Sequence, residues 1–321
     1  MITFVTTHAA RGTHKPVKRF PGSPPLRQRS YWKLFHSRSV HSGTYILTDF
    51  DRLGPWELEL ATHLYKHLKT SGARVLNNPG MFRARYAFLQ HLHREGLNSF
   101  RAWNPVLGEF PDRFPVFLRT QAAHRGTKTG LLDNASLAQE ALDEAVSDGH
   151  PLSDLMFVEY RAAPEENGTF LKLSAYRLGD RIVPAIVTMS MSWLAKLGDR
   201  AAGSQQQYEE DYERIQSYPY TDAIMAIFEA AKLDYGRIDF GIVDGRIETY
   251  EINTNPWMGM PNVHPVPLRI TATEKVRQLY ASALTDLDTE GPEKRIALDH
   301  PVLREQRAHD RRRLYLTRWT P

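Results

Sequence analysis

Residues 235–256 read YGRIDFGIVDGRIETYEINTNP, and this stretch constrains the fold more than any other part of the chain. It predicts two strands joined by a turn around Asp244-Gly245, that is, a β-hairpin. Because successive strand residues point to opposite faces, the apolar residues share one face. That face comprises Ile238, Phe240 and Ile242, which Tyr250 and Ile252 can join. The opposite face carries charged and amide side chains, which an ordinary hairpin does not require.

The length of the turn decides which polar residues face each other across the hairpin. We expect a three-residue loop that ends at a left-handed Gly245, so that Arg237 faces Glu251. This register places four polar residues on one face: Arg237, Asp239, Glu251 and Asn253. A plain two-residue turn would shift the register by one residue and scatter these groups.

The polar face has the composition of a site for a divalent cation. Two carboxylates and an amide oxygen that project together repel one another unless a cation lies between them. Ligands that are all oxygen favour Mg²⁺ or Mn²⁺. We therefore predict a metal site with the ligands Asp239, Glu251 and Asn253. The alternative is a solvent-exposed polar face with one Arg–Glu pair, but the polar, proline-terminated loop after the second strand favours a site.

The order and spacing of these residues resemble a known superfamily. Arg237-Ile238-Asp239 on one strand and Glu251-Ile252-Asn253-Thr254-Asn255-Pro256 on the next are similar to the metal-binding end of ATP-grasp enzymes, in particular D-alanine–D-alanine ligases and glutathione synthetase-like carboxylate–amine ligases. Weaker similarity runs from about residue 74 to 256. The resemblance implies an ATP-grasp fold of α/β and α+β class, with an N-terminal doubly wound α/β domain and two lobes that hold ATP.

The resemblance also implies a reaction. An ATP-grasp ligase joins a carboxylate to an amine or similar nucleophile through an acyl phosphate, with ATP and Mg²⁺ (or Mn²⁺), so both partners would be small molecules. The predicted catalytic residue is Arg237, which would steady the transferred phosphoryl group or the tetrahedral intermediate. Two alternatives remain open: a small-molecule kinase on the same scaffold, and a nucleotide-binding protein without turnover.

The resemblance assigns two arginines to the phosphates of ATP. Arg119 ends an apolar strand where the superfamily usually has a phosphate-binding lysine, and Arg85 occupies the place of a second such lysine. Both replacements keep the charge, and arginine can hold phosphate with two hydrogen bonds. Each arginine alone also fits an ordinary surface position. The loop HRGTKTG (124–130) follows where relatives have a mobile lid, and Gly126 and Gly130 would permit its motion.

The segment MFVEYRA (156–162) resembles the hinge whose backbone pairs with adenine, although an ordinary edge strand is the alternative. We expect the side chains of Glu159 and Tyr160 near the base. Lys172 stands where many relatives carry the carboxylate that holds ribose, so either Glu165 or Glu166 replaces that carboxylate or Lys172 reaches a phosphate. The expected lining of the acceptor region is Ser190, Trp193, Lys196, Trp257 and Met258.

Periodicity and turn signals predict the elements and domains. The expected domains are 1–79 (α/β), 80–155 (central lobe), 156–290 (C-terminal lobe with the metal site) and 291–321 (basic tail). The expected helices are 55–71, 81–96, 135–147, 221–236 and 271–287. The expected strands include 44–50, 73–79, 114–120, 155–162, 170–178 and a continuous strand over 181–193. The Pro- and Arg-rich residues 16–33 are expected to form a long loop.

Composition excludes several other classes of protein. The chain has no cysteine, so disulfides and thiol catalysis are excluded, and it has no apolar run long enough to predict a membrane span. The N-terminus lacks the apolar core of a secretory signal, and we expect a cytoplasmic protein. A homodimer is an open alternative.

Charge is unevenly distributed. Residues 1–48 carry eight basic and no acidic residues, and residues 292–321 carry eight basic and four acidic ones. Such segments can bind nucleic acid, attract an anionic substrate, or form solvated arms, and we favour solvated arms. An Arg-rich, acid-free start is also typical of mitochondrial transit peptides, but its strand pattern argues against one. His63 and His67 lie one helical turn apart, yet no third metal ligand follows in the sequence.

Overall fold

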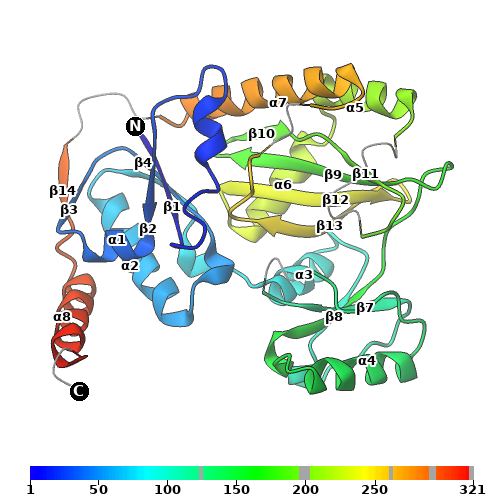
Figure 1. The fold of residues 1–321 in the computed structure, drawn as a ribbon, viewed down its shortest axis with the longest axis horizontal. Coiled ribbons are helices and arrows are strands. Elements are labelled where there is room, and N and C mark those ends of the chain that lie inside the picture. The colour runs from blue at the N-terminus through cyan, green and yellow to red at the C-terminus, as the bar shows by residue number, and fades with distance from the viewer. Residues whose placement is uncertain (123–125, 195–202, 260–262, 289–293, 318–321) are drawn as a thin grey trace.

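The structure, a computed structural model, describes residues 1–122, 126–194, 203–259, 263–288 and 294–317, with side chains up to residue 311. Figure 1 shows three units: a sheet with α1, α2 and α8 on the left, a small sheet with α4, and a larger sheet with several helices. The first sheet is parallel and the other two are antiparallel. The predicted mixed fold class, with α/β and α+β parts, is confirmed.

The N-terminal unit is a parallel sheet with strand order β2-β1-β4-β5. Its strands are β1 (Ile2–Thr6), β2 (Leu26–Ser30), β4 (Thr44–Leu47) and β5 (Arg74–Leu76). Helix α2 (Pro55–Thr70) connects β4 to β5, which confirms the predicted β-α-β opening. The helix begins at a proline, which needs no N–H partner in the first turn, and buries Leu60, Leu64 and Leu68 in the core.

The long loop predicted over residues 16–33 is wrong. The segment contains the 3-10 helix η1 (Lys15–Arg19), strand β2 and part of helix α1 (Tyr31–His36). β2 pairs along its whole length with β1, so a distant strand supplies its backbone hydrogen bonds. Its own residues, which include two arginines, give little local strand signal. Ser30 then caps α1 by accepting a hydrogen bond from the Lys33 N–H at 3.3 Å.

The small lobe has strand order β6-β8-β7. Its strands are β6 (Ala102–Trp103), β7 (Val116–Thr120) and β8 (Leu155–Glu159). Helix α4 (Ala135–Ser147), which the sequence predicts, packs against β7 and is capped by Asn134, which accepts from the Leu137 N–H at 3.1 Å. Because β8 pairs with both other strands, the domain boundary expected at residue 155 falls at the start of a strand of this lobe.

The large sheet has strand order β10-β9-β12-β13, and β11 also pairs with β9. Its strands are β9 (Phe170–Leu178), β10 (Arg181–Pro184), β11 (Thr188–Ser190), β12 (Tyr235–Val243) and β13 (Arg246–Asn253). The single strand predicted over 181–193 is therefore wrong. β10 pairs with the second half of β9 and β11 with the first half, and β10 ends at Pro184, which has no N–H to continue a ladder.

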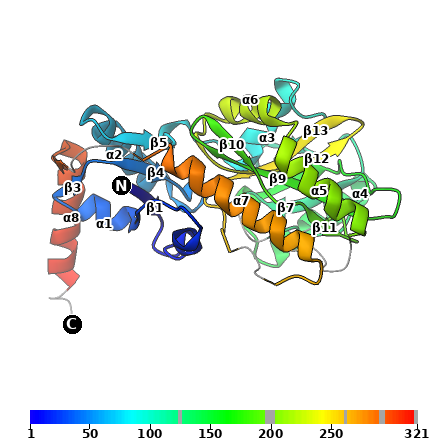
Figure 2. The ribbon, with the colours of Figure 1, turned by 90° about the horizontal axis from the view of Figure 1, so that it is seen from above.

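Helices flank this sheet, as Figure 2 shows from above. They are α3 (Arg85–Arg94), α5 (Gln205–Ser217), α6 (Thr221–Ala231) and α7 (Pro267–Thr285). Helix α6 ends five residues before the predicted stop at Gly236, because Lys232 already adopts a left-handed conformation and β12 begins at Tyr235. Four further 3-10 helices lie next to strands. η2 (Phe50–Arg52) follows β4, η3 (Pro79–Met81) follows β5, η4 (Pro105–Leu107) follows β6, and η5 (Leu152–Asp154) precedes β8.

One buried side chain joins the N-terminal sheet to the large sheet. Asn77, which follows β5, donates to the carbonyl oxygens of Leu47 at 3.0 Å and Tyr235 at 2.9 Å. Its side-chain oxygen accepts the N–H groups of Asp234 and Tyr235 at 2.8 and 2.9 Å. A buried amide that is fully hydrogen-bonded in this way fixes geometry without leaving an unsatisfied polar group. Asn77 therefore sets how β12 lies against the N-terminal unit.

The basic C-terminal segment is not a solvated arm, and this expectation is wrong. Strand β14 (Arg295–Ala297) pairs with β3 (Ser39–His41), and helix α8 (Pro301–Thr317) packs beside α1 and α2 (Figures 1 and 2). Leu303 is fully buried, and Arg307 donates to three backbone carbonyls, those of Phe35, Ser37 and Leu298. Within the described ranges, no helix has the length and apolar character needed to cross a bilayer.

The burial of Leu303 gives a test of this packing. Leu303→Ala should lower the free energy of unfolding by about 2–5 kcal/mol, because it removes methyl groups from a core that cannot fully close over the gap. Urea unfolding followed by circular dichroism measures this change. The matched control is Leu137→Ala on the exposed face of α4, which should change stability by only about 0.5 kcal/mol. Equal, small effects of both substitutions would contradict the docking of α8.

Candidate functional site

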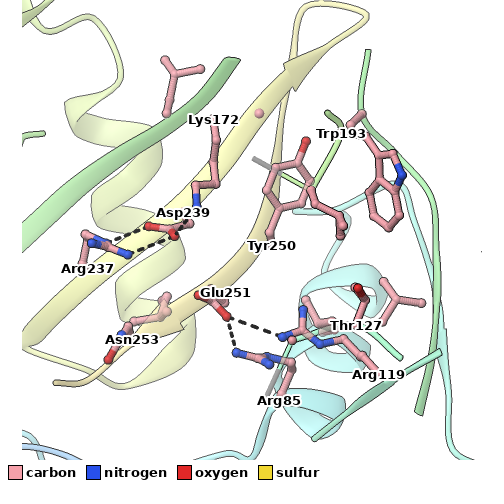
Figure 3. A pocket seen from close by; sticks show the side chains of 18 of the residues that line it. Arg85, Arg119, Thr127, Lys172, Trp193, Arg237, Asp239, Tyr250, Glu251 and Asn253 are labelled. Atoms are coloured by element: carbon pink, nitrogen blue, oxygen red, sulfur yellow. Dashed lines mark hydrogen bonds and ion pairs between the residues drawn. The ribbon is translucent and has the colours of Figure 1, made fainter. Parts of the chain in front are cut away.

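A cavity of about 940 Å³ is lined by all three units. The N-terminal unit contributes the loop after β1 and the segment after β4, including Thr13, Asp51 and Arg52. The small lobe contributes β7 and the end of β8, and the large sheet contributes β9, β12 and β13. Figure 3 shows the basic and acidic side chains that point into this space from the large sheet and from the small lobe.

The hairpin of β12 and β13 forms one wall of the cavity, but its turn differs from the prediction. Val243 pairs with Arg246, so the turn has two residues, Asp244 and Gly245, with φ of 51° and 74°. Two left-handed residues in a row make the turn whose twist matches that of the strands, and aspartate tolerates this conformation. The three-residue loop expected from the sequence is therefore wrong.

A β-bulge at Tyr250 compensates for the shorter turn. Phe240 pairs with Thr249 and Asp239 pairs with Glu251, so Tyr250 is an extra residue on β13. The bulge shifts the register by one further residue in the same direction, so the four polar residues again share one face, but in different pairs from those expected: Asp239 lies opposite Glu251 and Arg237 opposite Asn253. Tyr250, expected on the apolar face, instead lines the cavity and lies over Gly241, where a Cβ would come within 2.3 Å of the tyrosine oxygen.

Asp239 is held by three neighbours on its own sheet. Arg237 donates to both carboxylate oxygens, at 2.8 and 3.1 Å, and the Lys172 ammonium lies 3.4 Å away (Figure 3). The Ser174 hydroxyl donates a further bond at 3.0 Å. Asp239 is only 2% exposed, so this carboxylate is stabilised by protein groups instead of water. The same contact raises the pKa of Arg237, which therefore stays charged at any ordinary pH.

Glu251 is held from the other side of the cavity. Its carboxylate bonds Arg85 from α3 and lies 3.8 Å from the guanidinium of Arg119 on β7 (Figure 3). Burial opposes ionisation of Glu251, but Arg85, Arg119 and the more distant Lys172 and Arg237 outweigh it and lower its pKa to about 2. Glu251 is thus a permanent anion that links the large sheet to the small lobe.

The two arginines keep hydrogen-bonding capacity that Glu251 does not use. Among the described residues, the Arg85 Nη1 and the Arg119 Nε atoms are buried and have no hydrogen-bond partner. A buried N–H without a partner is costly, and such groups are usually satisfied by something the protein binds. Burial and the neighbouring Arg85 also lower the pKa of Arg119, as expected where two like charges are held together. The pair is therefore suited to an anion with several oxygens.

Repulsion between the two carboxylates does not require a metal at the polar face, because four basic side chains already neutralise them. In the described ranges, no three His, Cys, Asp or Glu side chains group in a way suited to a metal ion. The predicted set of Asp239, Glu251 and Asn253 contains two carboxylates and one amide. The Asn253 oxygen accepts from the Asn255 N–H at 2.8 Å and keeps one lone pair. This donor set fits Mg²⁺ in its chemistry, since all three donors are oxygens.

Aromatic side chains line another part of the cavity. Trp193 lies 5.0 Å from Phe117 and 5.6 Å from Tyr160, measured between ring centroids. Trp193 was expected near an acceptor, but these contacts place it beside the predicted hinge. Burial raises the pKa of Tyr160, and its N–H donates to the Pro115 carbonyl at 2.9 Å. Glu159 turns its carboxylate to the backbone N–H of Arg101 at 2.9 Å.

The remaining predicted site residues lie in different environments. Gly126 and Thr127 line the cavity, and the loop is held to β7 through the Lys128 N–H, which donates to Leu118 at 2.8 Å. Glu166 is exposed and does not line the cavity, whereas Glu165 does, because the turn points neighbouring side chains in different directions. Met258 is buried in the core and Ser190 is buried outside the cavity lining, whereas Trp257 lines it. His124, Arg125 and Lys196 lie outside the described residues.

Sequence reasoning missed the part of the cavity that the N-terminal unit forms. Arg52 lines the cavity and pairs with the buried Asp49, which also accepts the Thr7 N–H at 3.2 Å. The signal was present in the run TDFDR (48–52), where two acids and an arginine directly follow the buried strand β4. Nothing local, however, indicates that this strand end meets the hairpin, more than 180 residues later, and this proximity is a property of the fold alone.

Comparisons with known proteins give structural neighbours only, since no family model and no curated protein matches the sequence. The D-alanine–D-alanine ligase from Bacillus anthracis, complexed with ATP, is 12% identical over 89% of this chain and 98% of its own, with a TM-score of 0.48. The D-alanine–D-alanine ligase from Coxiella burnetii is 12% identical over 99% of both chains, with a TM-score of 0.49. The ATP-grasp ligase PsnB, complexed with precursor peptide and AMPPNP, is 12% identical over 89% of this chain and 96% of its own, also with a TM-score of 0.49.

The lowered pKa of Glu251 predicts how its contribution to stability depends on pH. Because the pKa falls from 4.5 to about 2 on folding, the ionised group stabilises the protein above about pH 4.5, and this contribution is lost as the pH falls towards 2. Glu251→Gln should therefore lower the free energy of unfolding at pH 7 by about 1–3 kcal/mol, less than for a fully buried pair because the side chain is 27% exposed.

Urea unfolding at about pH 7 and pH 3 measures the difference in the free energy of unfolding between the wild type and Glu251→Gln. This difference should be smaller at about pH 3. The control is Glu274→Gln, an exposed position on α7 outside the cavity lining, which should unfold like the wild type at both pH values. A gap between Glu251→Gln and the wild type that is the same at both pH values would contradict the assignment.

Proposed function

We propose that this protein is an ATP-dependent ligase of the ATP-grasp kind, which joins a small-molecule carboxylate to an amine through an acyl phosphate. One observation carries the proposal. Arg85 and Arg119 line the cavity and carry buried N–H donors that have no partner among the described residues, and the opposite wall is a strand pair carrying two carboxylates. Buried, paired guanidinium groups facing an acidic strand pair fit a phosphate chain with a divalent cation between the two.

In this proposal the phosphates of ATP bind between the small lobe and the hairpin. Arg85 and Arg119 hold phosphate oxygens, and Gly126 and Thr127 cover them from the loop after β7. Lys172 lies on the other wall, beside Asp239. This position favours a contact of Lys172 with a phosphate and not with the ribose. The base lies against Tyr160 and Phe117, where aromatic rings can stack on a planar heterocycle.

The residues that would hold Mg²⁺ are Asp239, Glu251 and Asn253, all oxygen donors. Asp239 on β12 pairs with Glu251 on β13, and Asn253 lies two residues further along β13. The ion supplies neutralisation of the charge that develops on the transferred phosphoryl group. The chain's own part is to place basic side chains beside both carboxylates. These are Arg237 and Lys172 for Asp239, and Arg85 and Arg119 for Glu251.

The proposed reaction has two steps. A substrate carboxylate oxygen attacks the γ-phosphorus of ATP, the bond to the β-phosphate oxygen breaks, and ADP leaves. The amine then attacks the carbonyl carbon of the acyl phosphate, inorganic phosphate leaves with the bonding electrons, and the amine loses a proton. Arg237 stays charged, and its hydrogen bond to the Asp239 carboxylate fixes the position of its guanidinium group. The guanidinium can therefore stabilise the negative oxygen of the tetrahedral intermediate.

Nucleotide binding should depend on the two arginines. A ligand at about a hundred times its dissociation constant stabilises a protein by roughly 2.7 kcal/mol, and Arg85→Ala and Arg119→Ala should reduce the thermal shift caused by Mg-ATP. Thermal unfolding of each variant with and without Mg-ATP measures this shift. The control is Arg94→Ala, an exposed arginine at the end of the same helix as Arg85, which should keep the full shift. A full shift in all three variants would mean that the phosphates bind elsewhere.

The products distinguish a ligase from a kinase. A ligase should release ADP and inorganic phosphate in equal amounts only when a carboxylate and a nucleophile are both present, and should form a hydroxamate with hydroxylamine. A screen of amino acids and small carboxylates for ADP release would identify the substrates. Arg237→Ala should lower turnover by about a hundredfold or more while nucleotide binding changes little, because its contact strengthens in the transition state. Labelled γ-phosphate found attached to a product hydroxyl would replace the ligase with a kinase.

A further inference from the structure

We propose that Glu251 acts as an internal anion, which occupies the phosphate-binding arginines of the free protein and makes the site selective for a metal-bound triphosphate over a free one. This inference rests on the function proposed above and adds a specificity-determining role for one residue. It goes beyond holding a metal, because it assigns Glu251 a role before any ligand binds.

The first observation is that the basic partners of Glu251 lie outside its own sheet. Glu251 belongs to β13 of the large sheet, but it bonds Arg85 on α3 and pairs with Arg119 on β7 of the small lobe. These arginine side chains are only 11% and 16% exposed, so an anion cannot reach them fully without sharing them with Glu251. A free polyphosphate therefore meets a carboxylate already seated at its site, and the two anions repel each other.

The second observation distinguishes Glu251 from the other carboxylate of the face. Asp239 is 2% exposed and is held within its own sheet by Arg237, Lys172 and Ser174. An anion that binds Arg85 and Arg119 does not have to displace Asp239. Glu251 alone of the two reaches across the cavity, and its side chain is 27% exposed, so it can exchange partners.

A divalent cation allows that exchange. When a cation takes the negative charge of Glu251, the two arginines become available to phosphate oxygens, and no anion is left without a counter-charge. Without the cation, the same exchange leaves a carboxylate beside a phosphate chain in a site of low dielectric, which is strongly unfavourable.

The charge of the cluster agrees with this exchange. The cluster consists of four basic side chains (Arg85, Arg119, Lys172 and Arg237) and two carboxylates (Asp239 and Glu251), so it is positive by two charges. A triphosphate nucleotide with one bound divalent cation carries about two negative charges, and the free nucleotide carries about four. The metal-bound form balances the cluster, whereas the free form leaves an excess of negative charge inside the cavity.

Isothermal calorimetry with ATP in EDTA and with ATP in excess MgCl₂ tests the proposal on the full chain. The wild type should bind Mg-ATP at least about tenfold more tightly than free ATP. Glu251→Gln keeps the shape and an acceptor oxygen but removes the competing charge, so it should bind free ATP about tenfold more tightly than the wild type does. The control Glu274→Gln changes the net charge equally at an exposed site and should bind like the wild type.

The gain for free ATP is the decisive result, because loss of a metal ligand alone predicts only weaker binding of Mg-ATP. If Glu251→Gln binds free ATP no more tightly than the wild type, the internal-anion role is overturned while the proposed function stands. If the wild type binds neither form, the proposed function itself fails. Should Glu251→Gln not fold, as judged by circular dichroism, the wild type with inorganic tripolyphosphate decides: equal or tighter binding without Mg²⁺ overturns the proposal.

Discussion

The arrangement of the site depends on one irregularity in a β-ladder, the bulge at Tyr250. A two-residue turn gives the hairpin its favoured twist, but on its own it would bring Asp239 out of register with Glu251. The extra residue on β13 brings Asp239 opposite Glu251 and turns the Tyr250 ring into the cavity over Gly241. The charge cluster, the orientation of Arg237 and the link across to the small lobe all follow from this register.

The charge cluster then sets what the cavity can accept. The two carboxylates have little solvent around them, and two basic side chains lie beside each of them and offset the cost of burial. The surplus of positive charge and the unpartnered donors on Arg85 and Arg119 make the same cluster a site for a polyanion. Glu251 shares Arg85 on α3 and Arg119 on β7 with any anion that binds there, whereas the basic partners of Asp239 lie on its own sheet. The two carboxylates therefore differ in how ligand binding would affect them.

The position of the cavity is a consequence of how distant segments meet. Asn77 fixes the N-terminal sheet against the start of β12. The loop after β13 makes a second contact with the N-terminal unit, because the Thr254 hydroxyl accepts from the Phe50 N–H at 3.3 Å. The side chain of Asn255 donates to the Thr13 hydroxyl, also at 3.3 Å. The C-terminal segment completes the N-terminal unit through β14, which pairs with β3, and α8, which packs against α1 and α2.

The sequence by itself determined the residues of the hairpin face and the main helices, since alternation and helical periodicity are local properties of the chain. It therefore identified Arg237, Asp239, Glu251 and Asn253 as one group. The tertiary structure alone decided the bulge, the strand at 26–30, the docking of α8 and the place of Trp193, because long-range pairing supplies the hydrogen bonds and burial there. The partners of Glu251 lie more than 130 residues away in the sequence, and no local pattern encodes that distance.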